Sequence, residues 1–201
     1  MSDTRVAAPP VAAIANPAAL GLGGFALTTF VLSTHNANLA PDLTWVGLAF
    51  FYGGLAQFCA GMWEFRTGNT FGATAFSTYG AFWLSLATFI VLVLMGKVPA
   101  GDISNDVGWF LVSFAIFNTY MMFWSLRVSV AVFLVFLTLE ITEILLFIGA
   151  FNGSGPGVGL TGLGGWVGIL TAIVAWYTSA AVVANSMRAK PILPVGGPLW
   201  S

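Results

Sequence analysis

Residues 67–96 read TGNTFGATAFSTYGAFWLSLATFIVLVLMG and contain no formal charge. A helix rises about 1.5 Å per residue, so about 20 apolar residues cross the hydrocarbon core of a bilayer. Strands of a membrane barrel are shorter, about 9–11 residues, and alternate polar with apolar side chains. This run shows no such alternation, and a helix satisfies its backbone hydrogen bonds within one segment. We therefore expect a membrane-spanning helix here.

Similar charge-free runs lie at 6–41, 43–63, 107–126 and 144–187. Glycine, proline and polar residues divide the longer runs, and the pattern predicts an all-α integral membrane protein. The six expected helices are 17–35, 44–65, 70–96, 107–126, 128–151 and 164–187. The segment 152–165 (NGSGPGVGLTGLGG) is so rich in glycine that we expect a flexible, non-helical connection.

The composition excludes several classes of protein. Charged residues make up 6% of the 201 residues and hydrophobic residues 58%, whereas a soluble domain has about 25% charged and 45–50% apolar residues. The net charge of −1 argues against a nucleic-acid partner, because that affinity comes largely from neutralising phosphates. The single cysteine, Cys59, rules out an intrachain disulfide.

The basic residues predict the orientation. Five of the six are expected on one side, namely Arg5, Arg66, Arg127, Arg188 and Lys190. Lys97 is alone on the other side. By the positive-inside rule both termini then lie in the cytoplasm, which requires an even number of spans. We expect a cytoplasmic tail at 1–15, a six-helix domain at 16–187 and a second cytoplasmic tail at 188–201.

Catalytic and cofactor motifs are not found in the sequence. The glycine-rich segment lacks the GK[ST] ending of a phosphate-binding loop. Glu140 and Glu143 are three residues apart on one helix face, a spacing found in carboxylate metal sites. The one histidine, His35, stands at the end of the first helix, and no Glu-x-x-His occurs. We therefore expect no enzyme, no metal and no cofactor, and instead a pathway for a solute.

Polar residues inside the expected helices are candidates for that pathway. Thr70 and Thr74 recur at helical spacing, and such hydroxyls serve either a pathway or the packing of neighbouring helices. Gln57 and Asn118 are stronger candidates, because an amide buried in hydrocarbon costs several kcal/mol unless it is paired. Asn16 precedes Pro17, as at a helix start, and a helix N-terminus also attracts anions.

Three acidic residues lie within the expected helices. Glu140 and Glu143 fall near the middle of the fifth expected helix, where ionisable groups face a cavity or a partner. Glu64 precedes Arg66 by two residues and is either interfacial or part of the pathway. These three are candidates for proton coupling.

Several motifs together resemble one known family. Residues 16–22 (NPAALGL) are similar to the NPAPLGL signature of the acetate uptake transporter family, which includes the succinate–acetate permeases. FYGG, AQ, AG and EF within 51–65 match the family's second helix, and GNTFG, AF, YG and FW within 68–83 match its third. The likeness runs from about residue 16 to 185. Two departures are Ala19 in place of the signature's proline, and the two glutamates of the fifth helix.

The resemblance implies a bundle with its own pore, assembled as a homohexamer in the plasma or inner membrane. It implies transport of acetate, and of succinate or other short carboxylates, by a channel or a proton-coupled carrier. The family's constriction of Phe, Tyr and Leu falls on Phe25, Tyr79 and Leu139, with Leu137 as the alternative register. Two other hypotheses remain: a pore for neutral solutes such as ammonia or undissociated acid, and a membrane sensor or assembly protein without flux.

Overall fold

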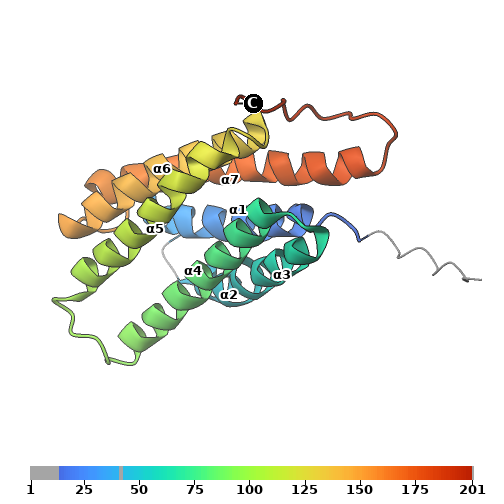
Figure 1. The fold of residues 1–201 in the computed structure, drawn as a ribbon. Coiled ribbons are helices and arrows are strands. Elements are labelled where there is room, and N and C mark those ends of the chain that lie inside the picture. Colours follow the sequence, from blue (N-terminus) through green and yellow to red (C-terminus); the bar gives the residue numbers. More distant parts are fainter. Residues whose placement is uncertain (1–13, 41–42, 201) are drawn as a thin grey trace, which may run out of the picture.

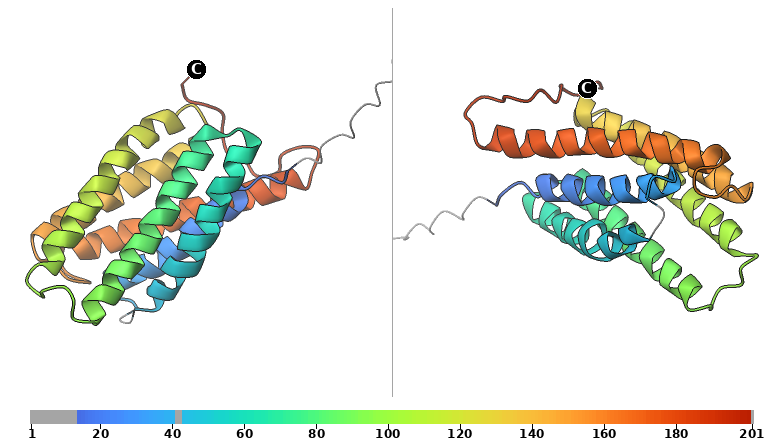
Figure 2. Two further views of the ribbon diagram at one scale, coloured as in Figure 1. Left: turned by 60° about the horizontal axis from the view of Figure 1, so that its bottom comes forward. Right: turned by 180° about the vertical axis from the view of Figure 1, so that it is seen from behind.

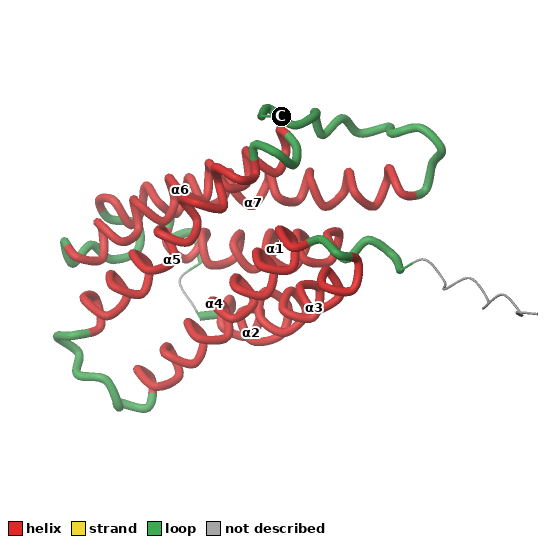
Figure 3. The backbone as a smooth tube through the Cα atoms, viewed as in Figure 1, coloured by secondary structure: helices red, strands yellow, loops and turns green. Residues whose placement is uncertain are grey.

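The computed structural model describes residues 14–40 and 43–200, and within these ranges every regular element is a helix (Figure 3). Residues 1–13, most of the expected N-terminal tail, lie outside the described residues. The helices are α1 (Ala18–Asn36), α2 (Thr44–Phe50), the π-helix η1 (Phe51–Ala56), α3 (Gln57–Thr67), α4 (Thr70–Leu94), α5 (Ile103–Ser125), α6 (Val130–Phe151) and α7 (Gly159–Ser186).

The prediction of six spans is confirmed. Six helices in the described part of the chain are long and apolar enough to cross a membrane, because α2, η1 and α3 continue one another as Thr44–Thr67. The fifth expected helix matches α6 closely, whereas α5 begins at Ile103, four residues before its expected start. Side chains cap α4 and α6, since Asn69 accepts a hydrogen bond from Gly72 N and Ser129 accepts one from Val132 N.

The expectation of a non-helical segment up to residue 165 is wrong at its second half, because α7 begins at Gly159. Glycine is a poor helix former in isolation, but here its lack of a side chain permits close packing. A Cβ on Gly165 would lie 2.7 Å from the carbonyl carbon of Asn36, and one on Gly164 would lie 2.7 Å from Leu146 Cδ2. Close approach of helices at small residues therefore outweighs propensity.

Helix α1 is central to the bundle. It packs along α7 on one side and against η1, α3 and α2 on the other, while α6 lies between α5 and α7 (Figures 1 and 2). The backbones of the consecutive helices α4 and α5 lie apart, and aromatic side chains fill the space between them. Tyr79 and Phe82 of α4 pack there against Phe114 of α5, and Phe25 of α1 packs on Tyr79.

The π-helix η1 lies where α1 approaches the second span most closely. A Cβ on Gly24 would lie 2.7 Å from Tyr52 O, and a Cβ on Gly53 would lie 2.6 Å from Thr28 Oγ1. The widened turn ends at Ala56, directly before Gln57. Such π-turns rotate the helix that follows and occur often at functional sites.

Candidate functional site

Two cavities of about 250 and 240 Å³ penetrate the bundle from opposite ends of α1. Asn16 lines the one at the start of α1, and His35 lines the one at its end. We call them the Asn16 cavity and the His35 cavity. Their linings have three residues in common, which are Phe25, Tyr79 and Leu139.

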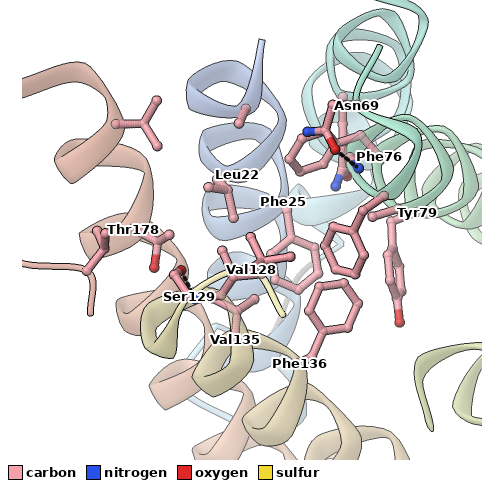
Figure 4. Close-up of a pocket in the computed structure, with 18 of the residues that line it drawn as sticks. Leu22, Phe25, Asn69, Phe76, Tyr79, Val128, Ser129, Val135, Phe136 and Thr178 are labelled. Carbon is pink, nitrogen blue, oxygen red and sulfur yellow. Dashed lines mark hydrogen bonds between the residues drawn. The ribbon is translucent and has the colours of Figure 1, made fainter. Parts of the chain in front are cut away.

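These three side chains come from α1, α4 and α6, and each is less than one tenth exposed. The rings of Phe25 and Tyr79 meet edge to face with centroids 5.8 Å apart. Figure 4 shows both rings beside Phe136 at the inner end of the Asn16 cavity. Leu137, the alternative register, lines neither cavity. A path between the two cavities therefore meets an apolar ring.

The Asn16 cavity has a mostly apolar lining with a few neutral polar side chains, and none of the described residues in it is a lysine or an arginine. Gln57 is 1% exposed, and its Oε1 has no hydrogen-bond partner among the described residues. Asn16 Oδ1 accepts from Ala18 N at 2.9 Å, so this asparagine caps α1 as expected from the sequence. The other polar residues of the lining are Asn69, Ser129, Tyr79 and Thr178 (Figure 4).

Three of the five uncharged polar candidates line neither cavity. Thr70 is exposed and Thr74 half-buried, while Asn118 lies behind Tyr79 in the bundle. Further along the same run of hydroxyls, Ser77 fills the space that a Cβ on Gly61 would occupy. At Ser77 the run therefore serves the packing of α3 on α4.

Asn118 joins Tyr79 to the two glutamates of α6. Tyr79 Oη donates to Asn118 Oδ1 at 2.8 Å and lies 3.3 Å from Glu143 Oε1. Asn118 Nδ2 donates to Phe136 O at 3.0 Å and to Glu140 Oε2 at 2.7 Å. Glu143 lines the His35 cavity, whereas Glu140 lines neither cavity. The tyrosine of the constriction is thus held by buried polar groups.

The third acid, Glu64, belongs to the turn between α3 and α4. It is 1% exposed, and its Oε2 accepts from Asn69 Nδ2 at 2.9 Å and from Thr67 Oγ1 at 3.1 Å. Glu64 lines neither cavity, but its partner Asn69 lines the Asn16 cavity. The carboxyl group therefore orients a residue of the cavity wall.

Several residues that line the cavities are not among the candidates from the sequence. Asn69 carried a signal, since an asparagine before a helical run is a typical N-cap. Ser129 carried the same signal at the start of α6. Thr178 carried none, because a single threonine within a long apolar run does not show which face of the helix it occupies. The sequence places His35 at the end of the first helix and does not indicate that this residue lines the His35 cavity.

The C-terminal segment 188–200 turns back after α7 and runs toward the start of α6 (Figure 1). Val195 lines that cavity, and its carbonyl accepts from Ala131 N at 2.9 Å. Tyr177 Oη donates to Pro194 O at 2.6 Å. Further on, the Trp200 ring stacks on Trp124 with centroids 6.0 Å apart. The segment is therefore part of the cavity wall.

Comparisons with known proteins agree with this architecture. The sequence profile of the GPR1/FUN34/yaaH family matches residues 2–196. The chain is 45% identical over 204 aligned residues to acetate permease A of Emericella nidulans, covering 93% of this chain and 67% of that protein. It is 37% identical over 184 residues to the succinate-acetate/proton symporter SatP of Escherichia coli K12, covering 91% and 96%.

A solved structure is also similar. The bacterial acetate channel SatP superposes with a TM-score of 0.85 at 35% identity, covering 92% of this chain and all of that one. The chain thus spans about two thirds of the fungal relative and nearly the whole of the bacterial ones. The resemblance inferred from the sequence motifs is confirmed.

Proposed function

The chain belongs to the GPR1/FUN34/yaaH family, and on that premise we propose that it carries acetate and other short carboxylates, succinate included, across a membrane. The observation that supports this most is the pair of cavities that meet at Phe25, Tyr79 and Leu139. The path would run through each subunit, from the Asn16 cavity past this ring to the His35 cavity.

A carboxylate needs donors along such a path, because leaving water without compensation is prohibitive for an anion. The described cavity walls offer no cation. Asn16, Gln57 and Asn69 supply amides at the Asn16 cavity. Neutral donors bind a carboxylate weakly, which favours release over retention and suits fast passage. Thr70 and Thr74 have no place on this path.

The apolar ring supplies selectivity in this proposal. The side chains of Phe25, Tyr79 and Leu139 do not replace the water molecules around a hydrated ion. A small carboxylic acid can lose its water there because its hydrocarbon end contacts the apolar ring favourably. The Tyr79→Ala variant should therefore admit larger acids. Lactate and succinate uptake would rise relative to acetate uptake, and an unchanged ratio would contradict the constriction. Tyr120→Ala, at an exposed tyrosine, is the matched control.

The orientation and assembly are also proposals. With the basic loops in the cytoplasm, the Asn16 cavity and the tail 188–201 face the cytoplasm, and the His35 cavity faces outward. We expect a homohexamer in the cell membrane, as the family resemblance implies. Native mass spectrometry of the purified protein measures the subunit number, and cysteine labelling from either side measures the orientation.

The direct test is uptake of labelled acetate by the purified protein in liposomes, with protein-free liposomes as background. Succinate and lactate should compete, and ammonium should not. A pore for ammonia or undissociated acid is the second candidate, and the apolar ring is compatible with it. Passage of a neutral acid should track the protonated fraction as pH changes. Acetate uptake that equals background would refute the proposal.

A further inference from the structure

The orientation of the Asn118 amide is set by its two neighbours. Nδ2 lies 3.0 Å from Phe136 O and 2.7 Å from Glu140 Oε2, and both of these atoms accept hydrogen bonds. The NH₂ group therefore points at them and uses both of its hydrogens. Oδ1 then faces Tyr79 Oη at 2.8 Å and must accept the phenol hydrogen. Asn118 is 0% exposed, so no solvent molecule replaces these partners.

Tyr79 cannot donate a hydrogen bond to Glu143 as well as to Asn118. A tyrosine hydroxyl has one hydrogen, and Tyr79 gives it to Asn118. Glu143 Oε1 lies 3.3 Å from the same hydroxyl oxygen, so an ionised Glu143 would place two acceptors against each other. A proton on Glu143 turns this contact into a hydrogen bond from the carboxyl group to Tyr79. Glu143 is 3% exposed, and its Oε2 has no partner among the described residues, so a charge there would be uncompensated.

Hydrogen-bond donors surround the carboxyl group of Glu140, in contrast to that of Glu143. Its Oε2 accepts from Asn118 Nδ2 and its Oε1 from Thr119 Oγ1, each at 2.7 Å. The single hydrogen of the Thr119 hydroxyl also has Ala115 O within reach at 2.8 Å. When that hydrogen goes to Glu140, Ala115 O still has its backbone donor within α5. Both oxygens of an ionised Glu140 are thus satisfied by donors.

We propose that Glu143 carries a proton and passes it to the carboxylate substrate in the His35 cavity, while Glu140 is an ionised positioning residue that orients Asn118 and, through it, Tyr79. This inference rests on the proposed function. It assigns different roles to two glutamates that lie less than one helical turn apart on α6.

The transfer step is balanced without a further reagent. The O–H bond of Glu143 breaks as an O–H bond forms on the substrate, which leaves a neutral acid and a Glu143 carboxylate. The neutral acid then passes Phe25 and Leu139, where an anion would find no donor. A proton from water in the His35 cavity restores Glu143. One proton accompanies each carboxylate, so the cycle moves no net charge for a monocarboxylate.

Other titratable groups near Glu143 are few. Tyr79 contacts Glu143, His35 lines the same cavity, and Glu140 lies on the far side of Asn118. The histidine is engaged at Nδ1 with Ala40 O at 3.2 Å. Glu143 therefore supplies the one carboxyl group in the described lining of the two cavities.

Infrared spectroscopy of the purified protein at neutral pH tests the charge states without transport. A protonated carboxyl group has a C=O stretch distinct from the bands of a carboxylate. We expect this band to weaken in Glu143→Gln and to remain in Glu140→Gln, with both proteins melting cooperatively. A band of undiminished intensity in Glu143→Gln, or a band that weakens in Glu140→Gln instead, would overturn the assignment.

Acetate uptake under an imposed potassium diffusion potential tests the transfer step. Wild-type uptake should not respond to the sign of the potential. Glu143→Gln keeps a hydrogen-bond donor toward Tyr79 but has no proton to give, so uptake should fall at least about 100-fold, within the range usual for a lost proton-transfer group. Any residual flux should follow the potential. Glu143→Asp should restore electroneutral uptake in part, and Glu140→Gln should slow uptake while keeping it electroneutral.

The outcomes separate the two proposals. Wild-type uptake with an unaltered, potential-insensitive Glu143→Gln variant refutes the role of Glu143 and leaves acetate transport standing. Wild-type uptake that follows the potential also refutes proton transfer, because the anion then crosses alone. If the wild type moves no acetate, the proposed function fails, and the transfer step fails with it.

Discussion

Replacing Tyr79 by phenylalanine separates the ring of the constriction from its hydroxyl group. The ring keeps its edge-to-face contact with Phe25, and only the oxygen is removed. Asn118 Oδ1, which is 0% exposed, then loses the donor that lies 2.8 Å away. The Glu143 carboxyl loses its contact as well. The variant should therefore be less stable even though its shape is unchanged.

The size of the effect follows from these contacts. A buried acceptor left without a donor costs about 1–3 kcal/mol. In a chain of this size each kcal/mol lowers the melting temperature by about 2–4 °C, so Tyr79→Phe should melt roughly 2–12 °C below the wild type. Thermal unfolding in one detergent, followed by tryptophan fluorescence, measures the shift. Transport should persist, since the apolar ring is retained.

Tyr120→Phe is the matched control, because Tyr120 lies on α5 and is 46% exposed. It should melt within about 1 °C of the wild type, as surface substitutions usually do. A Tyr79→Phe variant as stable as this control would refute the reasoning. It would mean that Asn118 finds another donor, and the count of hydrogens that assigns the proton to Glu143 would fall with it.

Two further predictions concern packing. A Cβ on Gly80 would lie 2.7 Å from the backbone of Phe58, so Gly80→Ala should lower stability by about 1–3 kcal/mol. The control is Gly47→Ala, which has open space around it and should be neutral or stabilising in the same melting assay. Tyr177→Phe removes the hydrogen bond to Pro194 O, and trypsin should then cleave the C-terminal segment roughly 2- to 12-fold faster than in the wild type; equal cleavage rates would contradict a stabilising role for this bond.

The candidate site was only partly accessible from the sequence. Gln57 and Asn16 could be chosen because a polar group in an apolar run needs a partner or a cavity. The constriction residues came from the family resemblance, since a phenylalanine among eighteen has no distinguishing local signal. Helical spacing alone indicated Thr70 and Thr74, and this spacing does not show which face of a helix meets the cavity.

The sequence by itself determined the number of spans and the class of the protein. Charge and hydropathy act on each segment separately, because every backbone polar group in lipid must be satisfied within its own helix. The tertiary structure decided the early start of α7, the π-turn before Gln57, the return of the C-terminal segment and the different surroundings of Glu140 and Glu143. These features depend on how each helix is rotated against its neighbours. In lipid an apolar side chain suits both the core and the outer surface, so the sequence of one helix does not encode that rotation.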